Sequence, residues 1–420
     1  MRLRLGLVLV TLLAALAVAL SVPHRSEQGA LSGDHRRPVG PTAGAPDRHG
    51  QPRQTSDGEP GAIAPPYNPY LRAKPRITKD RQWQVSPGIR FRKWVQTDSR
   101  GRARLFLLRA DPNVPGVSVE YGEMPIVPQR APVPTLVARA HGLGGVNGGF
   151  FDIYDTGAPL GVGVDRNRGF LHGATETWFN TFFISADGSA HIAPQRLQAS
   201  IAEYPQIHIT NYNSPRVRAG SIGIYTHYWG DSRGFSITDG QTKDLRTVLV
   251  DQGRVVANRP GVTKGYPVTG TLLVGRGIGA TQLAQLEVGS RAQVSWSLPG
   301  NPAFAIGGET ILLKNGKVRA TDDSILHPRT AVGIDRDTGQ VLLLAVDGRT
   351  ESSDGYTLVQ LARMMKSLGA EDALNLDGGG STTMVAPSRD GTVQVQNHPS
   401  DGSLRSVGDA VVLRYSPPKP

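Results

Sequence analysis

Residues 355–385 read GYTLVQLARMMKSLGAEDALNLDGGGSTTMV, and this run predicts a helix, a short link, a strand and a glycine-rich loop. Apolar residues at offsets of three and four between 356 and 368 fall on one face of a helix, and Gly369 ends it. A short apolar strand then delivers Asp377 at its end. The three glycines that follow let backbone N–H groups converge on an anion without a Cβ in the way. We therefore expect a tight αβ unit that places this loop at the edge of a sheet, although a plain glycine turn is the alternative.

Further motifs of the same kind occur in a fixed order along the chain. They are GVNGGFFD (145–152), HPRTAVGID (327–335), LLLAVDGR (342–349), the run at 355–385 and PSDGSLRSVGDAVVL (399–413). Their order and wording resemble the phosphodiester glycosidase family over roughly residues 105–417, most densely after residue 303. The resemblance implies an enzyme that acts on a sugar joined through its anomeric carbon to a phosphodiester.

Three carboxylates are the candidate catalytic residues. Asp377 and Asp347 each close an apolar strand just before a glycine, where a side chain faces the loop side of a sheet. We expect Asp377 to act as base or nucleophile, with Asp347 and Glu309 as alternatives for the second carboxyl role. A turn-capping carboxylate is the other interpretation for each. Retention or inversion depends on the distance between the carboxyl groups, which the sequence does not give.

The remaining candidates would bind substrate. Because the leaving group is a phosphate monoester, such a site needs positive charge and N–H donors on the phosphate more than it needs a strong general acid. Arginines inside the motifs could clamp phosphate in a bidentate manner, although a structural ion pair is the usual role of a single arginine. The candidates are Arg329, Arg349, Arg405, Asn375, Gly378, Gly379, Ser381, Thr382, Asn147 and Gly148.

Several neighbours have two open interpretations. Asn147 could bond a sugar hydroxyl or sit in a left-handed turn. Phe150 and Phe151 could form a stacking wall or belong to the core. His327 could orient a neighbour or be structural, and Asp401 and Asp409 are candidates for supporting other site groups.

The fold class that the pattern predicts is α+β, with one domain of mixed or antiparallel β-sheets and two or three helices. Expected strands are 103–109, 117–121, 181–184, 247–250, 292–296, 331–334, 341–346 and 410–415, and expected helices are 135–140, 281–286 and 356–368. Strands mostly follow strands, which disfavours a Rossmann fold.

The N-terminal part of the sequence predicts an extracytoplasmic location. Residues 1–21 carry two arginines and then an apolar run, as in a secretory signal peptide or a short membrane anchor. Residues 22–77 are rich in Pro, Gly and Arg and predict a disordered linker, and residues 78–420 form the expected catalytic domain. Residues 1–105 carry 18 Lys and Arg against 7 Asp and Glu, so they account for the whole net charge of +11. The basic linker could hold the protein near an envelope polyanion or a membrane surface, or serve solubility only.

Composition and motif content also limit the chemistry. The chain has no cysteine, which excludes disulfides and thiolate chemistry. No nucleic-acid recognition motif accompanies the basic residues, so nucleic-acid binding is not expected. We expect no cofactor, and a phosphorylated glycan as the partner. Two rival functions remain: a phosphodiesterase using Mg²⁺ or Ca²⁺ on oxygen ligands such as Asp347, Asp377, Asn375 and Glu309, and a non-catalytic envelope protein that binds phosphorylated glycans.

Overall fold

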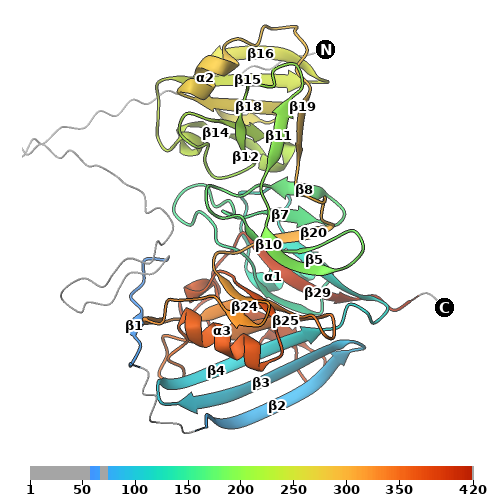
Figure 1. Cartoon of the computed structure of the whole chain (residues 1–420), viewed down its shortest axis with the longest axis vertical. Coiled ribbons are helices and arrows are strands. Elements are labelled where there is room, and N and C mark those ends of the chain that lie inside the picture. The colour runs from blue at the N-terminus through green and yellow to red at the C-terminus, as the bar shows by residue number, and fades with distance from the viewer. Residues whose placement is uncertain (1–56, 67–73, 419–420) are drawn as a thin grey trace, which may run out of the picture. The chain divides into compact units, whose positions relative to one another are not determined.

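The computed structural model describes residues 57–66 and 74–418, which lie within one compact unit, Ala43–Pro420 (Figure 1). The described residues form seven β-sheets and three α-helices, α1 (Val133–Arg139), α2 (Ile278–Leu283) and α3 (Leu358–Ser367). Three 3-10 turns are η1 (His227–Trp229), η2 (Gly234–Thr238) and η3 (Gly379–Ser381). The prediction of a strand-dominated fold with two or three helices is confirmed for these residues.

An antiparallel sheet of eight strands is the largest element. Its order is β2 (Arg76–Ser86), β3 (Ile89–Asp98), β4 (Gly101–Ala110), β25 (Gln340–Val346), β24 (Arg329–Asp335), β26 (Asp372–Asn375), β21 (Ile311–Lys314) and β22 (Lys317–Val318). The expected strands 331–334 and 341–346 form an antiparallel hairpin, β24–β25. β26 pairs on both sides, so the strand before the glycine loop lies inside the sheet, and the loop leaves from the strand's end.

Three five-stranded sheets and three short pairs complete the fold. The first five-stranded sheet is β28 (Val393–Val395), β27 (Met384–Pro387), β6 (Gly144–Asn147), β29 (Asp409–Tyr415) and β5 (Val117–Glu123). The second is β10 (Ala190–Pro194), β9 (Asn180–Ile184), β20 (Phe304–Gly307), β7 (Gly163–Asp165) and β8 (Gly169–His172). The third is β12 (Ile209–Tyr212), β13 (Ile222–Tyr225), β18 (Thr271–Arg276), β15 (Leu245–Asp251) and β16 (Arg254–Pro260). The short pairs are β1 (Ala62–Ile63) with β23 (Ile325–Leu326), β11 (Gln198–Ile201) with β19 (Val294–Ser297), and β14 (Asp231–Arg233) with β17 (Lys264–Pro267).

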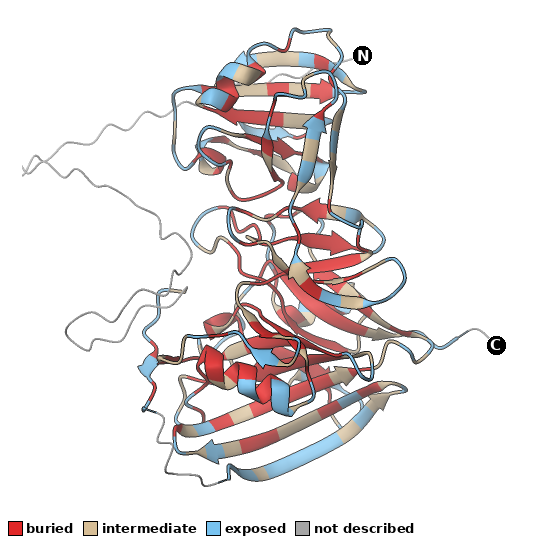
Figure 2. Cartoon of the chain, in the orientation of Figure 1, coloured by how far each residue is buried: buried red, intermediate tan, exposed pale blue. Residues whose placement is uncertain are grey.

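Both faces of the eight-stranded sheet are buried at its centre (Figure 2). Leu342 and Leu344 of β25 belong to the core under α3, whereas Leu343 and Ala345 belong to the core shared with β6 and β29. A strand covered on both sides has no polar face, which explains the continuous apolar run before Asp347. The sheet therefore holds the strand ends rigidly where the candidate site residues emerge.

The predicted helices have shifted ends. α3 begins after Thr357, whose side chain forms a capping box with Gln360, and it is followed by Gly369 at φ 100°. α2 begins at Ile278, three residues before the expected start. A Cβ on Gly279 in its first turn would lie 2.3 Å from the carbonyl oxygen of Ser221. Periodicity located these helices, and caps and close contacts set their ends.

The N-terminal predictions are met only in part. Residues 1–56 and 67–73 lie outside the described residues, and so does the whole predicted signal or anchor. Within the stretch predicted as a disordered linker, Ala62–Ile63 form β1 against β23, and β2 already begins at Arg76. For these residues the prediction of disorder is wrong, because backbone pairing, which hydropathy does not report, holds them. No helix in the part of the chain that the structure describes is long and apolar enough to cross a membrane.

Candidate active site

The glycine loop is tied by its backbone to two of the other motifs. The N–H of Leu376 donates to the carbonyl of Thr330 (2.9 Å), and that of Gly379 donates to Pro328 (3.0 Å). The N–H of Asp377 donates to the carbonyl of Gly148 (3.0 Å). These bonds bring the motifs at 145–152, 327–335 and 375–385 to one place.

The side-chain amide of Asn147 links these three motifs by hydrogen bonds. Its Nδ2 donates to the carbonyl of Asp377 (2.6 Å), and its Oδ1 accepts from Thr330 Oγ1 (2.8 Å) and from the N–H of Thr383 (3.1 Å). The residue is fully buried. The amide therefore holds the loop, and these bonds leave little capacity for the sugar contact expected from the sequence.

A close contact explains why position 148 is a glycine. A Cβ at this position would lie 2.2 Å from Oδ1 of Asp409. That oxygen accepts from the N–H of Gly149 (2.8 Å), while Oδ2 accepts from the hydroxyl of Tyr121 (2.7 Å). Gly148 thus makes room for a buried carboxylate, and Asp409 supports the segment as expected. Burial raises the pKa of Asp409 to about 6.

A cluster of cationic groups lies beside the loop. Arg349 donates from both terminal nitrogens to the carboxylate of Asp57, at 3.0 and 3.1 Å. Arg405 approaches the same carboxylate at 3.4 Å, and the N–H of Gly380 donates to it at 3.2 Å. Two guanidinium groups and one backbone N–H thus surround a single carboxylate. This is the donor set of an anion-binding site, and we refer to Arg349, Arg405 and Gly380 as the anion pocket.

The glycines are needed for this approach. A Cβ on Gly379 would lie 2.3 Å from Oδ2 of Asp57, and a Cβ on Gly380 would lie 2.2 Å from Nη2 of Arg405. The expected role of the loop, close backbone approach to an anion, agrees with this geometry. Gly378 contributes a different contact, since its Cβ would meet the carbonyl of Pro328 at 2.7 Å.

Supporting side chains orient both arginines. Asp401 accepts from Nε and Nη2 of Arg405, at 2.9 and 2.6 Å. His327 Nδ1 lies 3.0 Å from Nη2 of Arg349. Burial, with the positive charges of Arg329 and Arg349, lowers the pKa of His327 to about 2, so its ring is a neutral acceptor for Arg349. Asp401 and His327 therefore hold the two arginines in position.

Asp377 lies beside the anion pocket. Only 8% of the residue is exposed, and this burial raises the pKa of its carboxyl to about 7. The Ser381 hydroxyl and the charge of Arg405 oppose the rise, while the charge of Asp57 adds to it. A carboxyl that is half ionised near neutral pH suits proton transfer. Ser381 and Thr382 are buried with the loop, where the carbonyl of Thr382 accepts from Asn397.

Glu309 and Arg329 form a second charged group. Burial raises the pKa of Glu309 to about 7 and lowers that of Arg329 to about 10. The opposite charge of each group reduces the pKa shift of the other. Arg329 donates to the carbonyls of Tyr356 (2.9 Å) and Ile325 (3.3 Å). The N–H of Glu309 donates to the carbonyl of Asn375 (3.1 Å). Asn375 Oδ1 is buried and has no hydrogen-bond partner among the described residues, which is unusual for a buried acceptor.

Asp347 is engaged elsewhere. Its Oδ1 accepts from the N–H of His398 (3.0 Å), and its Oδ2 lies 3.5 Å from Nε of Arg104. Burial raises its pKa. No contact among the described residues joins its carboxylate to Asp377 or to the anion pocket. The aromatic candidates also serve packing, because Phe150 lies 4.9 Å from the ring of Trp178 and Phe151 belongs to a hydrophobic cluster.

Sequence reasoning missed Asp57. It lies in the stretch interpreted as a linker, and the letters around it, DGEP, indicate only a turn. No local signal pairs it with Arg349, Gly380 and Arg405, which lie 292, 323 and 348 positions away.

Comparison with known proteins agrees with the predicted resemblance. The family model described as phosphodiester glycosidase matches residues 244–414, a range that contains Glu309, Arg329, Arg349, Asp377 and Arg405. Residues 244–414 are therefore similar to the phosphodiester glycosidase family. Asn147, Gly148 and Asp57 lie outside the matched range.

Similar proteins place this family match in context. N-acetylglucosamine-1-phosphodiester alpha-N-acetylglucosaminidase of Mus musculus is 41% identical over 175 residues, which cover 36% of this chain and 30% of that protein. An uncharacterized prophage-derived protein of Bacillus subtilis is 33% identical over 119 residues, 27% of this chain and 17% of that protein. The chain thus spans less than a third of the length of these curated relatives. A protein of Synechocystis of known structure shares the fold, with a TM-score of 0.69 at 21% identity, over 81% of this chain and 64% of that chain.

Proposed function

We propose that this protein is a hydrolase that cleaves the glycosidic C–O bond of a sugar-1-phosphodiester. The observation that carries the proposal is the anion pocket, where Arg349, Arg405 and the N–H of Gly380 surround the carboxylate of Asp57. The Asp57 carboxylate stands in for a substrate phosphate, which would displace it. The family match supports the class of substrate.

The chemistry follows from the charges around this pocket. Water adds to the anomeric carbon, the C–O bond breaks, and the phosphate monoester leaves with the bonding electrons. The two guanidinium groups stabilise the charge that develops on the leaving oxygens. Asp377, with a pKa near 7, accepts the proton from water in its ionised form.

As the second catalytic carboxyl group beside Asp377, we favour Glu309 over Asp347. Glu309 lies with Arg329 and Asn375, whereas the Asp347 carboxylate is held by Arg104 and the backbone of His398. The unpartnered Oδ1 of Asn375 would accept from a sugar hydroxyl in this arrangement.

We further propose an extracytoplasmic setting, with cell-envelope or exopolysaccharide material as the source of substrate. The N-terminal apolar run and the basic linker support this setting. Metal independence is part of the proposal. Among the described residues no three His, Asp or Glu side chains are grouped as a metal site would require, and EDTA tests the point directly.

The test is hydrolysis of an N-acetylglucosamine-1-phosphodiester by the full chain in ¹⁸O-labelled water, with and without EDTA. The proposal expects label in the released sugar and no loss of activity with EDTA. Label in the phosphate, or activity lost with EDTA and restored by Mg²⁺ or Ca²⁺, would indicate a metal phosphodiesterase instead. Binding without turnover across a panel of sugar-1-phosphodiesters would indicate a non-catalytic glycan-binding protein.

A further inference from the structure

The outer strands of the eight-stranded sheet form a basic wing that the proposed reaction does not use. We define this wing as β2, β3 and β4 with their connections, residues 76–110. It holds ten Lys and Arg and only two Asp. β2 is the last strand of the sheet and is largely exposed, as Figure 2 shows. The charge is therefore presented by a defined surface of the folded protein.

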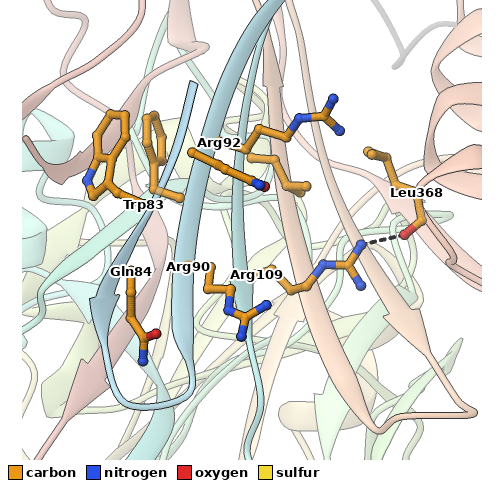
Figure 3. A pocket seen from close by; sticks show the side chains of 9 residues that line it. Trp83, Gln84, Arg90, Arg92, Arg109 and Leu368 are labelled. Carbon is orange, nitrogen blue, oxygen red and sulfur yellow. Dashed lines mark hydrogen bonds between the residues drawn. The ribbon is translucent and has the colours of Figure 1, made fainter. Parts of the chain in front are cut away.

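A cavity of about 340 Å³ lies on the α3 side of this wing. Figure 3 shows Arg90, Arg92 and Arg109 on its strands and the carbonyl of Leu368, just past the end of α3, at its border. The strand register places Gln84 opposite Arg90, and Arg90 opposite Arg109. The cavity is thus floored by a row of three long polar side chains across three strands.

One of the three arginines at the cavity has no acidic partner among the described residues. Arg92 is paired with Asp80 through two bonds of 2.9 and 2.6 Å. Arg109 donates to the carbonyl of Leu368 at 2.5 Å and lies 3.5 Å from the carboxylate of Asp335. Arg90 is exposed, and its side chain makes no hydrogen bond or ion pair with any residue that the structure describes. Like charges directly opposite one another on adjacent strands are destabilising. Asp335 offsets the charge of Arg109, so Arg90 is the position in this row where a bound anion would relieve repulsion.

We propose that this cavity binds the acidic groups of a polysaccharide chain. The guanidinium groups suit phosphate, sulfate or carboxylate oxygens. The amides of Gln82, opposite Arg92, and of Gln84 supply the donors and acceptors that sugar hydroxyls need.

Two other kinds of polyanion fit the wing less well. Base stacking needs exposed aromatic rings, but Trp94 is 3% exposed. Trp83 borders the cavity, but its ring packs on Phe91 and its Nε1 is bonded to the carbonyl of Pro387. A membrane surface needs apolar side chains to insert, and Ile77 is the one strongly exposed large apolar residue among the described residues of the wing.

The cavity and the anion pocket are linked by β25. Arg109 pairs with Leu342 near the start of this strand, and Arg349 follows its end. Five residue steps lead from Leu342 to Asp347, just past the end of the strand, which corresponds to roughly 17 Å. The choice of a glycan as the ligand rests on the proposed function, in which an acidic polymer held at the wing would present a sugar phosphodiester to the pocket.

Charge reversal tests the cavity. The variant Arg90→Glu removes the exposed charge at its floor without breaking a bond of the fold. Arg81→Glu is the matched control, because Arg81 pairs with Lys93 and so faces the opposite side of the same two strands. Binding of the full chain to dextran sulfate is measured by calorimetry at fixed salt, with neutral dextran of equal length as the reference probe.

The proposal expects about tenfold weaker binding of dextran sulfate for Arg90→Glu and less than a twofold change for Arg81→Glu. Equal losses in both variants, or no loss in Arg90→Glu, would overturn it. Tighter binding of a DNA duplex or of anionic vesicles than of dextran sulfate, with the same dependence on Arg90, would also overturn the choice of ligand. Hydrolysis of a small sugar-1-phosphodiester should be unchanged in Arg90→Glu. Absence of that hydrolysis in the wild type would count against the proposed function alone.

Discussion

Asp377 and Asp347 have the same local sequence context and opposite environments. Each ends an apolar strand and precedes a glycine. Asp377 lies beside Arg405 and the anion pocket, whereas the carboxylate of Asp347 is taken up by Arg104 and the backbone of His398. The loop after β25 still serves the site, but through Arg349, two residues later. A strand end brings a loop to a site, and the contacts of neighbouring loops decide which of its side chains faces the ligand.

The largest expected effect comes from exchanging these two carboxylates for amides. Asp377→Asn should lower turnover by about 10³-fold, because it removes the proton acceptor. Asp347→Asn should leave turnover within about threefold. Steady-state hydrolysis of a sugar-1-phosphodiester by both variants measures the difference. Equal losses would mean that the two strand ends share the chemistry after all.

The arginines give the next contrast. Arg349→Gln should weaken binding of a phosphodiester by roughly 100-fold, because it removes a bidentate pair of charged hydrogen bonds. Arg329→Gln should act mainly on folding, since Arg329 donates to the carbonyls of Tyr356 and Ile325. Its expected cost is about 2 kcal/mol of unfolding free energy. Isothermal titration and urea unfolding separate the two, and a purely binding defect in Arg329→Gln would contradict this division.

The free energy of unfolding should show that Asp347 has a structural role. Asp347→Ala leaves the N–H of His398 without its acceptor and should lower the unfolding free energy by about 2 kcal/mol. Chemical denaturation measures this value. A fully stable variant with no activity would instead restore Asp347 as a catalytic candidate.

The pH dependence should show the smallest but most diagnostic change. Burial raises the pKa of Asp377 to about 7, so the carboxylate forms, and kcat/KM rises, as the pH increases through that value. Burial raises the pKa values of Glu309 and Asp409 as well, to about 7 and 6. Raised folded-state values stabilise the protein fully below pH ~4 and lose that contribution as the pH rises through 6–7. Activity that falls steadily from pH 5 to 8 would contradict an ionised Asp377.

The sequence predicted the elements well and the contacts poorly. The apolar run of β25 and the periodic face of α3 follow from local patterning, and so does the glycine loop. A sugar contact and a left-handed turn both stay open for Asn147 in the sequence, because an isolated motif cannot reveal that Thr330, Thr383 and the carbonyl of Asp377 use its amide. Asp57 was overlooked because ion pairing across the whole chain leaves no local trace.

The most direct test of the account is phosphate binding at the position of the Asp57 carboxylate. Inorganic phosphate is titrated calorimetrically into the wild type, Asp57→Asn and the double variant Asp57→Asn with Arg349→Gln. The account predicts binding about tenfold tighter in Asp57→Asn, because a competing charge is removed, and loss of that gain in the double variant. Equal affinity in all three proteins would show that Arg349, Arg405 and Gly380 do not form the phosphate site.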